Sequence, residues 1–205
     1  MYTQSIAGLS LLFEFSFRTK IRFFLMRVAG SCIMSENTRF GGILLRAEII
    51  HEKQAYTATF ERHLAHQPQE VWAMLADNEK LQQWFPELKV EKLGKDGLLL
   101  FDMGDGSFEK MAITEYDEGK ILAFEWAEDH VRFELIPENE GTLLRLVETI
   151  NKITPQTAKD LAGWHVCLDV IQAILDGQEI ERMDEWEKWY PEYKRLLDSM
   201  TVEFE

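Results

Sequence analysis

Residues 154–176 read TPQTAKDLAGWHVCLDVIQAILD, and this stretch decides the fold. Thr154 is a preferred helix N-cap residue and Pro155 is tolerated at the first helical position, so the pair predicts where a helix begins. Gly177 follows the last apolar residue and predicts where the helix ends. Between these ends, apolar residues at helical spacing form a stripe wider than a lightly packed surface helix needs. They are Leu161, Trp164, Leu168, Val170, Ile171, Ile174 and Leu175. We therefore expect one long helix that lies against a broad partner.

The broad partner is predicted between residues 55 and 150. Residues 56–63 alternate between apolar and polar side chains, which predicts a first strand. Pro68 then begins one short helix, and Pro86 ends a second. After Pro86 the apolar period changes to two, as in strands. Six segments show this period: 88–93, 98–103, 108–116, 121–126, 131–136 and 143–150.

Short connections rich in Gly, Asp and Asn separate these strands, and such residues accept the backbone conformations of tight turns. Connections this short imply consecutive antiparallel hairpins. The predicted fold class is therefore α+β: a curved antiparallel sheet of seven strands wrapped round the long C-terminal helix, with two short helices after strand 1. A further apolar stripe from Trp186 to Leu197 predicts a terminal helix that Pro191 interrupts or restarts.

The chain is acidic, with a formal net charge of -14. Residues 51–205 hold 16 basic and 33 acidic residues, a net charge of -17, and such a body repels phosphate backbones and argues against nucleic acid as a partner. A chaperone or another basic protein remains compatible with such a surface. Cys32 and Cys167 lie far apart and belong to no metal-ligand pattern, so we expect no metal site, no cofactor and a reduced, cytoplasmic setting.

The first 33 residues are apolar and basic. They contain no run of the roughly 18 to 20 apolar residues that a membrane span requires, so stable membrane insertion is not expected. Residues 1–54 are interpreted as an N-terminal extension that is non-native or disordered, and residues 1–33 as translated sequence upstream of a start at Met34. A weakly membrane-attracted basic segment is the alternative for residues 1–33. Residues 40–50 fit either a short helix or an added edge strand, and the sequence leaves this open.

Several short motifs follow one another in order along the body. They are Pro68-x-x-Val71-Trp72, Leu81-x-x-Trp84-Phe85-Pro86, Phe124-Glu-Trp126, Gly141-Thr-x-Leu-x-Leu146, Ala162-Gly-Trp164 and the aromatic stretch from Trp186 to Tyr193. Together they resemble the family of homologues of the heat-shock protein 90 ATPase activator, of the C-terminal-domain type. That family belongs to the START-like, Bet v 1-like superfamily with a helix-grip fold, also called SRPBCC. The resemblance covers residues 55–198, which we expect to form one domain with its terminal helix.

The resemblance implies a cavity between the sheet and the long helix. In this superfamily such cavities bind lipids, sterols, polyketides and other hydrophobic or aromatic molecules. Strand alternation and the helix stripe place apolar candidates at it: Trp84, Phe101, Phe108, Trp126, Phe133, Leu146, Trp164 and Leu168. For each of these residues, plain core packing is the alternative.

Two polar residues join these candidates. Glu148 is in register with Leu144 and Leu146, so its carboxyl is expected to point inward with a raised pKa and to act as an acid or a ligand anchor. The alternative is a register change that leaves Glu148 in solvent. His165 follows Trp164 on the helix and is expected to flank the cavity.

The leading hypothesis is a cytoplasmic START-like domain that encloses a small hydrophobic or aromatic ligand and catalyses no reaction, because the sequence shows no catalytic constellation. The first alternative is an enzyme of the polyketide-cyclase kind that uses Glu148 or His165 as acid or base. The second is a stress adaptor similar to the chaperone-ATPase activator, although the separate chaperone-binding domain of the eukaryotic activator has no counterpart in the sequence.

Overall fold

The computed structural model describes residues 39–40, 43–44, 46–52 and 55–202. The elements are, in chain order, β1 Arg39–Phe40, β2 Ile43–Leu44, β3 Glu48–Glu52, β4 Ala55–Leu64, α2 Pro68–Ala76, α3 Asn78–Trp84, β5 Leu88–Lys92, β6 Leu98–Asp102, β7 Phe108–Asp117, β8 Ile121–Trp126, β9 Asp129–Glu138, β10 Gly141–Ile150, α4 Thr157–Leu175 and α5 Arg182–Val202. The predictions for residues 1–33, including the start at Met34 and the basic segment, concern a part of the chain outside these residues.

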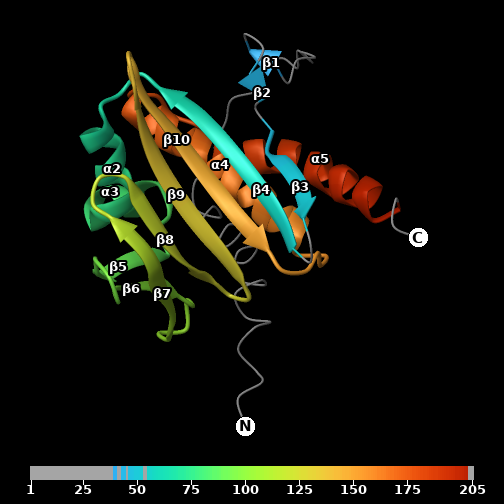
Figure 1. Cartoon of the computed structure of the whole chain (residues 1–205), viewed down its shortest axis with the longest axis horizontal. Coiled ribbons are helices and arrows are strands. Elements are labelled where there is room, and N and C mark those ends of the chain that lie inside the picture. Colours follow the sequence, from blue (N-terminus) through green and yellow to red (C-terminus); the bar gives the residue numbers. More distant parts are fainter. Residues whose placement is uncertain (1–38, 41–42, 45, 53–54, 203–205) are drawn as a thin grey trace, which may run out of the picture.

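One antiparallel sheet carries the fold, with the strand order β3-β4-β10-β9-β8-β7-β6-β5 (Figure 1). All seven predicted strands are present. The described residues add an eighth, β3, which pairs with β4 so that Ile49 lies opposite Ala58. The predicted count of seven was therefore one too low, and of the two readings left open for residues 40–50 the edge strand is correct. A short edge strand such as β3 shows little alternation between apolar and polar residues, so its sequence does not predict a strand clearly.

The two short helices begin with the signals that the sequence shows. Pro68 occupies the first turn of α2, where the Glu70 carboxylate accepts the Gln67 N–H at 2.9 Å. Asp77 caps α3, because its carboxylate accepts the N–H of Glu79 at 2.8 Å. These helices fill one end of the space between the sheet and α4 (Figure 1).

The long helix α4 begins two residues later than predicted. The Thr154 hydroxyl accepts the N–H of Gln156 at 3.2 Å, and the Thr154 N–H donates to the Thr157 hydroxyl at 2.9 Å. These bonds hold Pro155 and Gln156 in a turn before the helix. At the other end Gly177 has φ +67 and stops the helix, as predicted.

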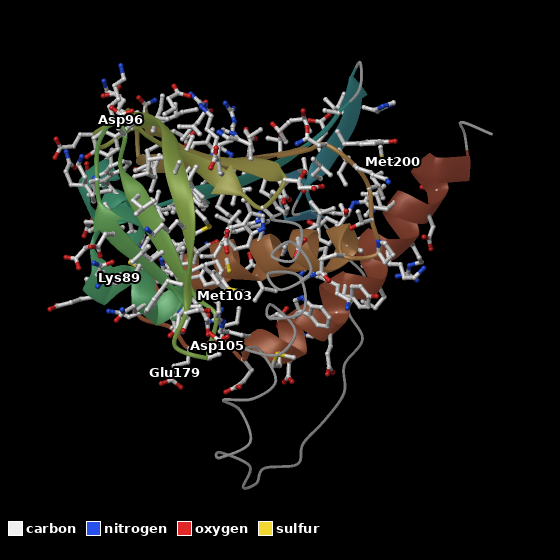
Figure 2. All side chains as sticks on the ribbon, turned by 90° about the horizontal axis from the view of Figure 1, so that it is seen from below. Lys89, Asp96, Met103, Asp105, Glu179 and Met200 are labelled. Atoms are coloured by element: carbon white, nitrogen blue, oxygen red, sulfur yellow. The ribbon has the colours of Figure 1, made fainter. Side chains whose placement is uncertain are left out.

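The terminal helix α5 is continuous through Pro191, so the predicted interruption was wrong. Proline removes the hydrogen bond to the carbonyl four residues earlier, that of Glu187. Both Pro191 and Glu187 are exposed, which lets water solvate the freed carbonyl. Beyond the proline, Tyr193 and Leu197 are buried and anchor the helix. Figure 2 shows α4 beneath the sheet with α5 alongside it.

Candidate functional site

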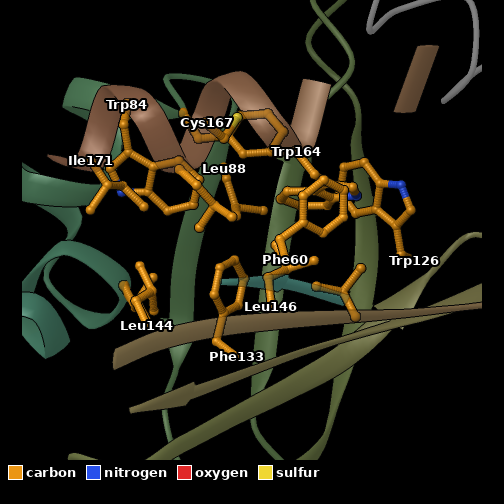
Figure 3. Packing of buried hydrophobic residues seen from close by; sticks show 14 of the residues in the cluster. Phe60, Trp84, Leu88, Trp126, Phe133, Leu144, Leu146, Trp164, Cys167 and Ile171 are labelled. Atoms are coloured by element: carbon orange, nitrogen blue, oxygen red, sulfur yellow. The ribbon is translucent and has the colours of Figure 1, made fainter. Parts of the chain in front are cut away.

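An aromatic layer fills the space between the sheet and α4. We use this name for Trp84, Phe85, Phe101, Phe124, Trp126, Phe133 and Trp164, all of them buried. The rings of Trp126 and Trp164 are 5.0 Å apart between centroids and meet edge to face. Phe85 lies about equally far from Phe101, Trp126 and Trp164, at 5.9, 6.0 and 5.9 Å. Figure 3 shows Trp126, Phe133 and Trp164, and Trp164 contacts both of the other two rings. Such contacts stabilise a core beyond the area they bury.

Most of the apolar candidates occupy this core. The structure brings together and buries Trp84, Phe101, Trp126, Phe133, Leu146, Trp164 and Leu168. Their burial is observed, whereas their role at a ligand site stays a prediction. Phe85 was missed, because it lies at the end of α3, where neither helical nor strand periodicity assigns a face. The signal available for it was its place between Trp84 and Pro86 in the family motif.

Phe108 was placed wrongly. Its side chain is 52% exposed on β7, outside the aromatic layer. Met111 and Ile113 face the core from this strand, so alternation puts Phe108 on the opposite face. A register shift between Ile113 and Glu115 in the pairing with β8 then turns Tyr116 partly inward. Phe108 and Tyr116 therefore lie on opposite faces of the sheet, although their positions in the sequence differ by an even number.

The rings of the aromatic layer touch one another across the region where the resemblance implies a cavity. Hollows lie elsewhere on the described surface. A groove of about 350 Å³ between the start of α4 and α5 is lined partly by Ile153, Pro155 and Tyr190. An open depression of about 760 Å³ lies at β5 to β7, beside Gly97.

Glu148 points into the aromatic layer from β10, as its register with Leu144 and Leu146 predicts. The residue is 2% exposed, so the alternative that placed it in solvent was wrong. Its Oε2 atom has no hydrogen-bond partner, and neither has Nε1 of the buried Trp164. By contrast, the buried Trp84 donates its indole N–H to the Met74 carbonyl at 2.7 Å. Two buried polar atoms thus remain unsatisfied at one place in the core.

Burial raises the pKa of Glu148 well above its ordinary value. The negative charges of Asp160 and Asp129 raise this pKa further, while the indole N–H of Trp164 acts in the opposite direction. Glu148 is therefore held as a neutral carboxylic acid over a wider pH range than an exposed glutamate.

We call Glu148, Asp160 and Asp129 the carboxyl cluster. Burial raises the pKa of Asp160 to about 7, although the Gln156 amide donates to its Oδ1 at 2.9 Å. Burial also raises the pKa of Asp129, against a hydrogen bond of 2.8 Å from the Asn151 N–H. Both aspartates are only partly buried, so the cluster extends from the core toward the surface. Sequence reasoning missed them, though Asp160 stands one helical turn before Trp164.

The carboxyl cluster does not form a metal site. Across the described ranges, no three His, Cys, Asp or Glu side chains are grouped so that they could hold a metal ion. The arrangement can instead accept hydrogen bonds, attract a positive charge or hold a proton.

His165 does not join Glu148. A residue that follows another on a helix is rotated by about 100° round the axis, which turns His165 from the aromatic layer toward α5. Its Nδ1 lies 2.9 Å from the Tyr193 hydroxyl oxygen, and its ring stacks on Trp189 at 3.7 Å between centroids. Its Nε2 lies 3.3 Å from Oδ2 of Asp169. The predicted position of His165 beside a cavity that contains Glu148 was therefore wrong.

None of the helices in the described part of the chain is long and apolar enough to cross a membrane.

Comparisons with known proteins agree with this architecture. A conserved protein of unknown function from Enterococcus faecalis is 28% identical, with a TM-score of 0.64 over 74% of this chain and 92% of that chain. An AHSA1-like protein from Rhizobium etli is 25% identical, with a TM-score of 0.51 over 63% of this chain and 88% of that chain. CalU16 from Micromonospora echinospora shares the fold at 22% identity, with a TM-score of 0.57 over 74% of this chain and 94% of that chain.

Among proteins with a curated description, none matches the chain. The family described as "Activator of Hsp90 ATPase homolog 1-like protein" matches residues 65–176, more than half of the sequence. These residues run from the end of β4 to the end of α4 and include Glu148, Trp164 and the aromatic layer. The chain belongs to the family of Activator of Hsp90 ATPase homolog 1-like proteins.

Proposed function

We propose that this protein binds a small hydrophobic or aromatic molecule between the sheet and α4, without catalysing a reaction. The observation that carries the proposal is the pair of unsatisfied atoms, Oε2 of Glu148 and Nε1 of Trp164, inside the aromatic layer. A buried polar atom without a partner costs about 1 to 3 kcal/mol. A ligand group that donates a hydrogen bond to Oε2 of Glu148 would satisfy that atom. The charged carboxylate that it stabilises would in turn accept the Trp164 N–H, which can only donate.

The aromatic layer suits the apolar part of such a ligand. Tryptophan and phenylalanine rings offer large flat surfaces to another ring. Because these rings are in contact, the ligand must displace a side chain. Phe85 is the best candidate: it lies at the C-terminal end of α3, outside regular structure, and touches Phe101, Trp126 and Trp164. A side chain at a helix end moves more readily than one held within a sheet.

Native mass spectrometry of the purified protein tests the proposal, together with analysis of an organic extract. We expect a bound small molecule in the wild type and in Phe108→Ala, which removes an exposed ring outside the layer. We expect its loss in Phe85→Trp, which adds volume where the ligand must enter. A wild-type protein that carries nothing and binds no added naphthalene derivative would count decisively against the proposal.

Acid catalysis in the manner of a polyketide cyclase is the second candidate. The raised pKa of Glu148 favours it, because a carboxylic acid kept neutral in an apolar site can donate a proton to a substrate. His165 cannot act as a second acid or base beside Glu148, because it faces α5. Cyclisation of an added poly-β-keto thioester by the wild type but not by Glu148→Gln would support this candidate. Binding without turnover in both proteins would support the first.

A further inference from the structure

The carboxyl cluster lacks a basic partner. Across the described residues, Glu148, Asp160 and Asp129 take part in no ion pair, although the charge of Lys159 lowers the pKa of its neighbour Asp160. Unlike exposed surface acids, these three carboxyls are wholly or partly buried, where an uncompensated negative charge is unfavourable.

Other carboxylates of the same sheet and helix are paired. Arg62 contacts Asp169 on α4 at 2.8 Å. On the outer face of the sheet, Arg145 lies 2.7 Å from Glu61, and Arg132 lies 2.9 Å from Glu115. The chain thus supplies arginines to Asp169, Glu61 and Glu115, but not to the carboxyl cluster. A positive charge from outside the chain is the complement that this place lacks.

Strand register and helix spacing place the cluster on two facing surfaces. Glu148 lies opposite Val131, and Asp129 stands two residues earlier on β9, so both project from the inner face of the sheet. Asp160 precedes Trp164 by four residues and shares the sheet-facing side of α4 with it. Oε2 of Glu148, which is buried and has no hydrogen-bond partner, belongs to a residue on the same inner face as Asp129, and this face is covered by the side of α4 that carries Asp160 and Trp164.

We infer that the ligand proposed above carries a protonated amine, which donates a hydrogen bond to Oε2 of Glu148 and is attracted by the charges of Asp160 and Asp129, while its apolar part lies on Trp126 and Trp164. The inference rests on the proposed function and names the chemical class of the ligand. An ammonium group donates several hydrogen bonds to carboxylates and is attracted to the faces of tryptophan rings. A single metal ion does not suit the cluster, since its carboxyls are not grouped as metal ligands.

The protonation of the empty site agrees with this assignment. Burial and mutual repulsion raise the pKa of Glu148 and of Asp160, so the empty cluster retains protons near neutral pH. An arriving ammonium ion stabilises the charged carboxylates and lowers their pKa values. Binding of an amine should therefore release protons from the protein, whereas binding of an uncharged analogue should not.

Three probes that share one ring system test the inference: 2-naphthylmethylamine, 2-naphthylmethanol and 2-naphthoate, measured by isothermal titration calorimetry in two buffers of different ionisation enthalpy. We expect the full-length wild type at pH 7.5 to bind the amine about ten-fold or more tightly than the alcohol, with 2-naphthoate weakest. Only the amine should release protons. Glu148→Gln should reduce the preference for the amine to about two-fold or less and keep the affinity for the alcohol.

Glu125→Gln is the matched control, because Glu125 is an exposed glutamate of the same sheet, on β8, two strands away from β10. Asp160→Asn, at the outer edge of the cluster, serves as a second variant if Glu148→Gln does not fold. Equal affinities for the amine and the alcohol in the wild type would overturn the inference and leave the proposed function intact. Absence of binding by all three probes would overturn both.

Discussion

The hydroxyl oxygen of Tyr193 on α5 lies 2.9 Å from Nδ1 of His165 on α4, and it accepts the N–H of Ala47 at 3.0 Å. On its other side the imidazole presents Nε2 to Oδ2 of Asp169, 3.3 Å away. A carboxylate only accepts hydrogen bonds, so Nε2 carries the proton and Nδ1 accepts the Tyr193 O–H. One chain of hydrogen bonds therefore joins the segment before β3 to both long helices.

Tyr193→Phe should destabilise the protein by about 1 to 3 kcal/mol, because it leaves the buried Ala47 N–H and the His165 Nδ1 without a partner. Urea unfolding followed by tryptophan fluorescence measures this change. Tyr190→Phe on the same helix is the control, since the ring of Tyr190 is half-buried and stacks on Trp186. Equal stabilities of the two variants would show that the chain of hydrogen bonds contributes nothing.

Burial lowers the pKa of His165, more than the neighbouring Asp169 carboxylate raises it. Between this lowered pKa and the ordinary value of about 6.5, the unfolded chain binds more protons than the folded one. The contribution of His165 to stability is therefore lost as the pH falls below about 6.5. Long-range ¹H–¹⁵N NMR at pH 6.5 should show a neutral ring protonated at Nε2. Protonation at Nδ1, or a cationic ring at that pH, would contradict the hydrogen-bond chain.

Glu148 and His165 show which site features the sequence can predict. The inward direction of Glu148 follows from a period of two that begins at Leu144, because β10 has no register shift over these residues. The direction of His165 depends on which side of α4 the sheet covers and which side α5 covers. Its neighbours Trp189 and Tyr193 lie more than twenty residues away, so local spacing could not assign its partners.

The strand β7 and the carboxyl cluster show what the sequence could not supply. A register shift within β7 places Phe108 and Tyr116 on opposite faces of the sheet, and no residue type in the sequence marks where this shift occurs. Asp160 and Asp129 are 31 residues apart, and their charges influence each other only because α4 packs against the inner face of the sheet. Such groupings arise from tertiary packing, whereas periodicity and turn residues predict the individual elements.

Phe101 and Phe108 form a matched pair for testing the register of β6 and β7. Phe101→Ala should destabilise the protein by about 3 to 5 kcal/mol, because Phe101 is buried and touches Phe85 and Trp126. Phe108→Ala should change stability by about 0.5 kcal/mol or less, because its ring is exposed. Chemical unfolding of both variants measures the difference. A large loss in Phe108→Ala would mean that β7 presents its other face to the core.

Glu148→Gln should stabilise the empty protein near neutral pH. A carboxyl whose pKa is raised in the folded state binds more protons there than in the unfolded chain, so stability falls as the pH rises above about 4. Asp160, with a pKa of about 7, adds to this fall between pH 4 and 7. Glutamine is uncharged, so the gain in the free energy of unfolding of Glu148→Gln over the wild type should grow from near zero at pH 4 to about 1 to 3 kcal/mol at pH 8.

Urea unfolding of Glu148→Gln and the wild type across this pH range measures the gain, with Glu125→Gln as the exposed control. A gain that does not grow with pH would mean that Glu148 is not buried as an acid between the sheet and α4.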